Sequence, residues 1–187
     1  MNTKVLFFAI LAMVTIPVSA QFSRQSESEV YNKLFYVELG GPGVIMSMNY
    51  DMRFNQESRL GFGFRVGAGF GISDFKVATG NGGYGYEAFD YQTHSYYSIP
   101  LQINYVFGKE HSSSTFEVGA GTSFLTRAVS LYNYDTVKEG QFIGHLSFMY
   151  RMQPVRSGFS LRVGFTPIIG TAGDLFPMVG VSLGYVF

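Results

Sequence analysis

The residues best suited to covalent chemistry are His145 and Ser147, which stand two positions apart. An imidazole beside a hydroxyl is the pairing used in nucleophilic hydrolysis, and it also needs a carboxylate to orient the histidine. After Glu139 the only acid is Asp174, in an expected connection, and Glu117 reaches His145 only if neighbouring strand registers align. We therefore favour a polar structural pair over a catalytic one.

A second motif, Gly80-Asn81-Gly82-Gly83-Tyr84-Gly85, formally matches the dinucleotide fingerprint G-x-G-x-x-G. No βαβ pattern surrounds it, so the match lacks the mechanism that gives this fingerprint its meaning. The surrounding segment is rich in aromatic residues, of which the candidates for contact with a protein or glycan partner are Tyr84, Tyr86, Phe89 and Tyr91. The alternative that we favour is an extension of two strands with glycine at its tip.

No spacing among His94, His111 and His145 and the acidic residues resembles a metal site, so we expect neither a metal nor another cofactor. No nucleic-acid module is discernible, and the formal charge of zero gives no reason to expect one.

Strict alternation of apolar and polar residues dominates the rest of the chain and predicts strands. The predicted strands cover residues 34–39, 44–54, 60–72, 97–107, 116–124, 142–151, 159–166 and 180–187. The connections between them alternate between short and long, as in outer-membrane barrels with short periplasmic turns and longer external loops. If the last strand descends to the periplasm at Phe187, counting back through the connections makes the strand over 44–54 descend as well. An ascending strand must then precede Gly40, which brings the number of strands to an even eight. A single bulged strand over 35–54 is the alternative and leaves an odd seven.

The first twenty residues, with Lys4, an apolar run and the ending Val18-Ser19-Ala20, predict a secretory signal peptide over 1–20. The run is shorter than the roughly 20 residues of a spanning helix. Residues 21–32 predict a flexible periplasmic leader, and 33–187 the barrel. Charged residues make up 14% of the chain and aromatic residues 17%, which leaves little charge for a water-facing surface.

The bulky face of each strand must point outward, because an eight-stranded barrel has an interior only wide enough for side chains. A bilayer is the compatible exterior, and the sequence therefore predicts an all-β, eight-stranded antiparallel up-and-down transmembrane β-barrel. Aromatic residues at the strand ends beside the short connections predict a girdle at headgroup level: Tyr50, Phe54, Tyr105, Phe107, Tyr150, Tyr185 and Phe187.

The opposite face of each strand points into the lumen. It carries seven charged side chains: Glu38, Asp51, Arg53, Arg65, Glu117, Arg151 and Arg162. Charges in a narrow interior are costly unless they are paired and hydrogen-bonded. We expect one paired network that closes the channel, with remaining hydrogen bonds supplied by Asn49, Gln102, Asn104, His145 and Ser147. A water-filled pore is the alternative.

With its opening Phe35-Tyr36-Val37-Glu38-Leu39-Gly40-Gly41 and its ending Gly184-Tyr185-Val186-Phe187, the chain resembles the small outer-membrane barrels of the OmpA and OmpX type. The resemblance implies a Gram-negative outer membrane with its lipid and lipopolysaccharide. It also implies insertion by the barrel-assembly machinery, which reads a closing strand with a terminal aromatic, here Tyr185 and Phe187. It implies no catalytic residue.

We expect a non-enzymatic barrel that serves envelope structure or surface interaction through its external loops. One alternative is a surface-binding or adhesin module that uses the aromatic loop 80–97. Another is a lipid A-modifying membrane enzyme, because His145 and Ser147 resemble the His-x-Ser arrangement of lipid A deacylases.

Overall fold

The computed structural model describes residues 30–82, 86–127, 129, 142–170 and 173–187, with the backbone alone at 75–82 and 86–92. The expected signal peptide and most of the expected leader lie outside the described residues. The strands are β1 (Lys33–Gly40), β2 (Met46–Arg53), β3 (Gly61–Gly82), β4 (Tyr86–Gly108), β5 (Ser114–Leu125), β6 (Phe142–Met152), β7 (Gly158–Phe165), β8 (Ile168–Ile169), β9 (Leu175–Phe176) and β10 (Val179–Val186). A 3-10 turn, η1 (Gly41–Gly43), joins β1 to β2.

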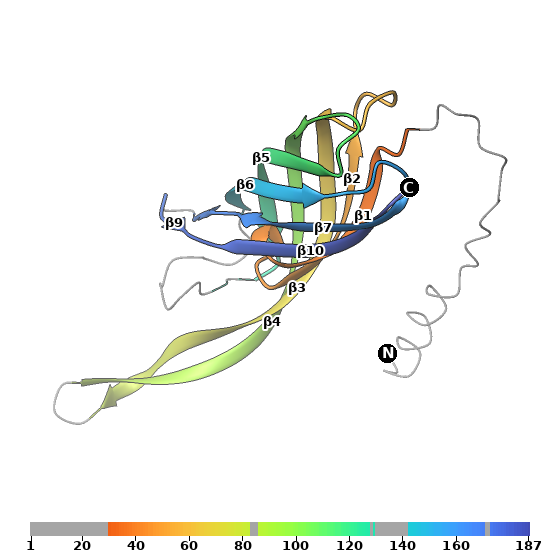
Figure 1. The fold of residues 1–187 in the computed structure, drawn as a ribbon. Helices are drawn as coiled ribbons and strands as arrows, with labels where there is room; N and C mark the ends of the chain where they lie inside the picture. The colour runs from red at the N-terminus through yellow and green to blue at the C-terminus, as the bar shows by residue number, and fades with distance from the viewer. Residues whose placement is uncertain (1–29, 83–85, 128, 130–141, 171–172) are drawn as a thin grey trace, which may run out of the picture.

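Antiparallel pairing runs around the sheet in the order β5-β4-β3-β2-β1-β10-β7-β6, and pairing of β5 with β6 closes it (Figure 1). The predicted all-β fold with a closed eight-stranded antiparallel barrel is confirmed. The first and last strands of the barrel, β1 and β10, meet at a closing seam. There Val37 stands opposite Leu183, and the amide of Phe187 donates to the carbonyl of Lys33 at 3.0 Å. The expected first strand is therefore separate from β2, and the alternative of one bulged strand over 35–54 is wrong.

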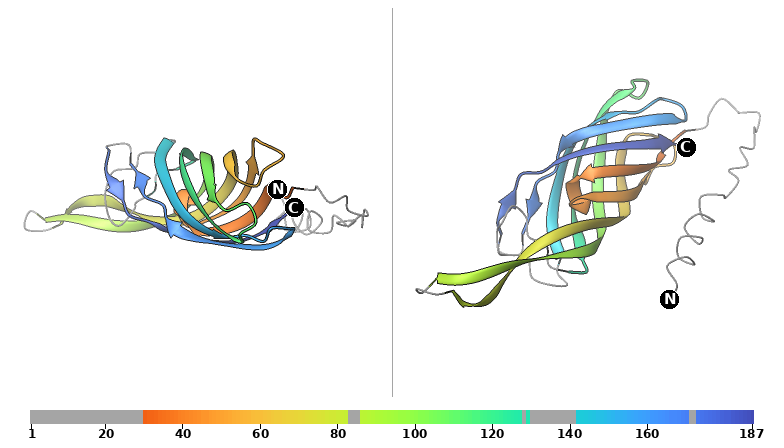
Figure 2. Two further views of the ribbon diagram at one scale, coloured as in Figure 1. Left: turned by 45° about the horizontal axis from the view of Figure 1, so that its top comes forward. Right: turned by 90° about the horizontal axis from the view of Figure 1, so that it is seen from below.

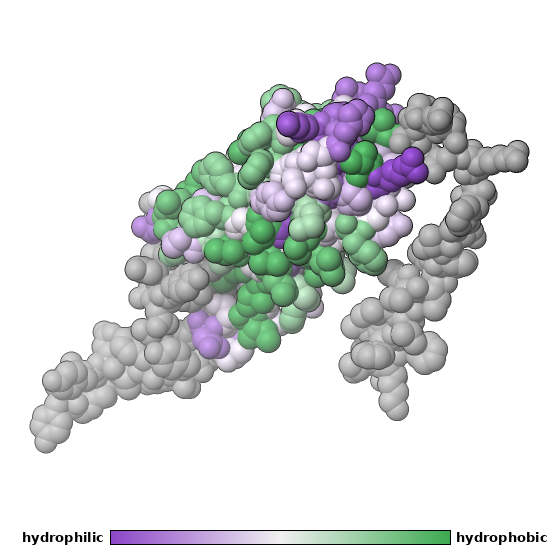
Figure 3. Space-filling model, in the orientation of Figure 1, coloured by the Kyte–Doolittle hydropathy of each residue, from purple (hydrophilic) through white to green (hydrophobic). Residues whose placement is uncertain are grey.

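Alternation in the sequence becomes alternation between the two faces of the barrel wall. In β2 the side chains of Ser47, Asn49, Asp51 and Arg53 are buried, while Met46 and Met48 on the opposite face are exposed. Small and hydrogen-bonding residues therefore fill the interior, and large apolar residues cover the exterior. Figure 3 shows apolar residues across the middle of one face and polar residues toward the end that carries the short connections.

Aromatic residues contact one another around the exterior at the end where the short connections lie. Neighbouring ring pairs with centroids 4.8–6.5 Å apart are Tyr50 with Phe64 and Phe187, Phe62 with Tyr105, Tyr105 with Phe107, Phe107 with Phe116, Phe116 with Tyr150, and Phe159 with Tyr185. Tyr185 and Phe187 thus lie on the outer face beside the closing seam.

Beyond the barrel rim, β3 and β4 continue as a two-stranded hairpin, in agreement with the favoured prediction of an extension of two strands (Figures 1 and 2). Two other segments differ from the sequence-based expectation. The expected connection at 170–177 includes the short strand β9, which pairs with β8 on the edge of β6. The strand expected over 44–54 begins instead at Met46. Among the described residues, no helix is long and apolar enough to cross a membrane.

Candidate functional site: the charged interior

Six of the barrel strands send charged side chains into one interior network. Its members, each at most 2% exposed, are Glu38 on β1, Asp51 and Arg53 on β2, Arg65 on β3, Glu117 on β5, Arg151 on β6 and Arg162 on β7. The structure thus brings together all seven charges that the sequence assigns to the lumen.

Glu117 lies at the centre of the network and uses both carboxylate oxygens. Arg151 Nη1 donates to Oε2 at 2.7 Å, and Arg162 Nη2 donates to Oε1 at 2.8 Å. Gln102 Nε2 also donates to Oε1, at 3.3 Å. Charge-assisted bonds of this kind are the strong ones in a dry interior.

Arg151 extends the network across the barrel to Asp51, because the same Nη1 atom donates to Asp51 Oδ2 at 2.9 Å. Asp51 also accepts hydrogen bonds from Arg53 and, at 2.9 Å, from Asn104 Nδ2. Asp51 stands opposite Arg65 in the β2–β3 register, yet its partners include Arg151 from the other side of the lumen. Residues that stand opposite each other on neighbouring strands are therefore not always the ones that form ion pairs here.

Glu38 holds the third part of the network through an ion pair with Arg65. Arg65 also donates from Nε to Asn49 Oδ1 at 3.1 Å and from Nη1 to Gln102 Oε1 at 3.3 Å. Arg162 Nη1 lies 3.9 Å from Glu38 Oε1, so Arg162 connects this part to Glu117. All three carboxylates thus belong to one connected set.

Tyr36 is an interior residue whose role in the site the sequence reasoning missed. Its ring lies 4.2 Å from the guanidinium carbon of Arg162 and 5.4 Å from that of Arg65. Cation–π contacts of this kind gain strength when the cation is desolvated. The signal was available, because Tyr36 shares the inward parity of Glu38.

At the end with the short connections, Arg59 continues the polar interior toward the mouth. Its Nη2 atom donates to the carbonyl of Gln153 at 3.1 Å, and the Gln153 side chain accepts a bond from Arg151 Nη2 at 2.9 Å. Burial lowers the pKa of Arg59, and nearby Glu110 opposes that shift. Arginine nevertheless stays protonated at neutral pH.

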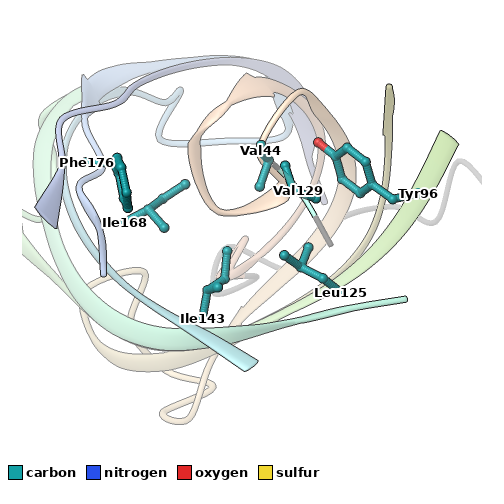
Figure 4. Close-up of a cluster of buried hydrophobic side chains, with 7 residues drawn as sticks. All are labelled: Val44, Tyr96, Leu125, Val129, Ile143, Ile168 and Phe176. Carbon is teal, nitrogen blue, oxygen red and sulfur yellow. The ribbon is translucent and has the colours of Figure 1, made fainter. Parts of the chain in front are cut away.

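A cluster of buried apolar side chains, the apolar cap, lies inside the opposite end of the barrel (Figure 4). It consists of Val44, Tyr96, Leu125, Val129, Ile143, Ile168 and Phe176, all buried. Leu125 and Ile143 share the inward parity of Glu117 and His145, a signal that could have revealed them. Tyr96, expected in the aromatic external loop, is instead one of these interior residues.

The turn between β1 and β2 folds inward beneath this cap, which corrects the outward position expected for Val44. Ser123 Oγ donates to the carbonyl of Pro42 at 2.7 Å, and Ser98 Oγ donates to that of Gly43 at 3.2 Å. Val44 has a φ of 74°, a strained value for a β-branched residue. Burial of the Val44 side chain against the cap helps to hold that conformation.

His145 and Ser147 are both buried in the interior and bond to different partners. Gln102 Nε2 donates to Ser147 Oγ at 2.8 Å, whereas His145 Nδ1 lies 3.4 Å from Ser123 Oγ. The oxygens of Glu117 are committed to Arg151, Arg162 and Gln102. This arrangement matches a polar structural pair, and the described residues contain no group of acids and histidines that could hold a metal.

The four aromatic loop candidates fall where side chains are not described. The backbones of Tyr86, Phe89 and Tyr91 belong to β4, and Tyr84 lies outside the described residues. Their expected contact with a partner stays a prediction.

No family model and no curated protein matches this sequence. Among solved structures, the N-terminal β-barrel domain of OprF from Pseudomonas aeruginosa has a similar fold, with a TM-score of 0.51 at 10% sequence identity. The match covers 86% of this chain and 98% of the OprF chain. At that identity the likeness is one of fold: the chain, like that domain, forms a closed antiparallel β-barrel.

Replacing Glu117 with glutamine tests how strongly the network supports the barrel. We expect Glu117→Gln to lower the free energy of unfolding by about 3–5 kcal/mol, because it leaves two guanidiniums buried without their shared carboxylate. Urea unfolding of the barrel in detergent micelles measures the change. The control Glu57→Gln, at an exposed position, should stay within about 0.5 kcal/mol of the unsubstituted chain. Equal effects of the two substitutions would contradict the central role of Glu117.

Proposed function

We propose that the chain is a non-enzymatic outer-membrane β-barrel with a closed lumen, which serves the structure of the bacterial envelope. The observation that carries this proposal is the inversion of polarity, with charges inside and large apolar side chains outside. Phe159, for example, is 76% exposed, and apolar side chains are exposed on each of the barrel strands. Soluble monomers rarely expose an apolar surface this extensive, whereas a bilayer requires one.

The dimensions of the wall support the same location. β5 has 12 residues and β6 has 11, close to the roughly 9–11 residues of a tilted transmembrane strand. The aromatic contacts beside the short connections fit the headgroup region of a bilayer. In this orientation the short connections and the C-terminus face the periplasm, and the β3–β4 hairpin projects outside the cell.

The closed lumen rests on two layers of different chemistry. The ion-pair network fills the middle of the interior, and the apolar cap covers the end from which the hairpin projects. An ion crossing this interior would have to displace paired charges and then enter a dry apolar layer, and both steps are costly.

The expected biological partners are those of an outer-membrane barrel. Lipid and lipopolysaccharide would surround the apolar exterior, and the barrel-assembly machinery would read the exposed Tyr185 and Phe187 at the closing seam. A signal peptide over 1–20 would direct the chain across the inner membrane. The lipid A enzyme is disfavoured because the hydroxyl of Ser147 is buried inside the barrel, away from lipid.

Expression of the full chain in a Gram-negative host tests the proposed location. We expect the protein in the outer-membrane fraction, with electrophoretic migration in detergent that changes on boiling because the closed barrel resists unfolding without heat. The boiled half of each sample serves as the control. Recovery as a soluble periplasmic protein would contradict the proposal.

The projecting hairpin supports a second candidate function, the binding of an extracellular protein or glycan. Pairing between β3 and β4 continues to Gly82 and Tyr86, whereas β2 pairs with β3 only as far as Phe70 and β5 with β4 only as far as Ser98. Beyond those points no other strand of the part of the chain that the structure describes pairs with the hairpin, and a two-stranded extension of this kind can offer its outer edges to a partner.

Replacing residues 74–93 with an Asn-Gly turn tests this candidate. The turn should preserve the barrel, because every strand pair within the wall remains, while binding of the cells to immobilised extracellular proteins and glycans is lost. The comparison is made at equal amounts of heat-modifiable barrel. Unchanged binding would reject a role for the hairpin.

A further inference from the structure

A groove interrupts the outer face of the barrel wall where β3, β4 and β5 run side by side. Its volume is about 480 Å³, within the range of about 300–1,000 Å³ that is typical of sites for small ligands. Its lining includes two outward-facing side chains from each of the three strands: Phe64 and Val66, Leu101 and Ile103, and Ala120 and Thr122. The outer surface is therefore not uniform, and one part of it is hollowed.

Small residues on β5 and β6 create the groove. Ala120 stands opposite Ile103 on β4, and Thr122 stands between Leu101 on β4 and Gly144 on β6. The side chains along β5 thus extend less far from the wall than the branched side chains of β4 beside them. The hollow follows from the sequence and from the strand register.

The lining of the groove is apolar. Its one hydroxyl, that of Thr122, already donates to the carbonyl of Ile143 at 3.1 Å. Arg65 and Gln102 also border the groove, but their side chains bond to each other in the interior at 3.3 Å. The described lining residues thus offer no free side-chain donor or charge to a sugar, a peptide or a lipid headgroup. The chemistry of the groove therefore suits a hydrocarbon chain.

The position of the groove indicates which lipid supplies that chain. Phe64, which lines the groove, also contacts the rings of Tyr50 and Phe54, with centroids 6.4 and 6.1 Å away. These rings lie at the end with the short connections, which the proposed orientation places at the periplasmic headgroup level. Phospholipids form the periplasmic leaflet of an outer membrane, whereas lipopolysaccharide forms the external one. The groove thus opens to the phospholipid leaflet.

We propose that this groove holds one acyl chain of a phospholipid from the periplasmic leaflet. The inference rests on the proposed location of the barrel in an outer membrane. Lipid tails are as apolar as the lining, so close packing distinguishes this chain from the lipids around the rest of the barrel. A flexible acyl chain can follow the groove, whereas an unfilled groove would leave its lining atoms without van der Waals partners.

Native mass spectrometry of the full chain tests the proposal. The protein is folded into vesicles that contain equal molar amounts of phosphatidylethanolamine and lipopolysaccharide, and it is then extracted in mild detergent. The expected spectrum contains a barrel whose mass is raised by one phosphatidylethanolamine. A barrel with no retained lipid, or with lipopolysaccharide in place of the phospholipid, would overturn the proposal. A dimer without lipid would also overturn it and would show that a second copy covers the groove.

A matched pair of variants tests whether the retained lipid lies in the groove. Ala120→Phe fills the groove with a ring, so the peak of the lipid-bound barrel should disappear. Ala68→Phe makes the same change at an exposed position of β3 outside the groove and should keep that peak. The two variants are compared at equal amounts of heat-modifiable barrel. Equal retention of phospholipid by both would refute the assignment.

A crystallographic measurement keeps the test independent of these variants. Crystals of the unsubstituted barrel grown with phosphatidylethanolamine brominated in its acyl chains should show anomalous peaks along the groove. A well-ordered outer face without those peaks would overturn the lipid site alone, because a heat-modifiable barrel in the outer-membrane fraction would still support the proposed function. Recovery as a soluble periplasmic protein would overturn both.

Discussion

The shared carboxylate of Glu117 is the interaction on which the interior depends. It binds Arg151 and Arg162 on neighbouring strands, and these two arginines reach Asp51 on β2 and Glu38 on β1. One acidic side chain thereby links opposite walls of the barrel. The desolvation of so many charges is offset only because almost every carboxylate oxygen in the network has a partner, as buried charges require.

A charged interior also determines which residues the wall can carry. Arginine side chains need space, and glycines on the inner face provide it. A Cβ atom at Gly63 would lie 2.5 Å from the guanidinium carbon of Arg53, and one at Gly119 would lie 2.7 Å from Ser147 Oγ. Because the inner positions are small or polar, the bulky residues of each strand cover the outside. The interior network and the apolar exterior are therefore two results of the same alternation.

Alternation allowed the strands and the inward charges to be predicted, because a period of two assigns each side chain to one face. The need for an even number of strands also identified β1 before Gly40. Partner choice could not be predicted in the same way: Asp51 stands beside Arg65 in register but bonds to Arg151 across the lumen. The alternation along a strand shows whether a side chain points inward or outward, but it does not show how far that side chain lies from the opposite wall.

The apolar cap was missed for a related reason. Val44 belongs to a turn that folds inward, and periodicity says nothing about the direction taken by a turn. Hydrogen bonds from Ser98 and Ser123 to turn carbonyls hold the segment inside. These bonds join residues 55 and 81 positions apart, so no local pattern contains them. The sequence places Tyr96 in the external loop, because nothing in the unbroken strand β4 marks where the barrel ends and the hairpin begins.

The central claim is that paired charges and an apolar cap make the barrel interior solid. Ionic current through the full chain inserted in a planar lipid bilayer tests this claim most directly. The account predicts a current that stays at the level of the bare bilayer, because the proposed closed lumen would leave no continuous aqueous path across the charged network and the cap. Sustained stepwise openings by the unsubstituted chain would contradict it.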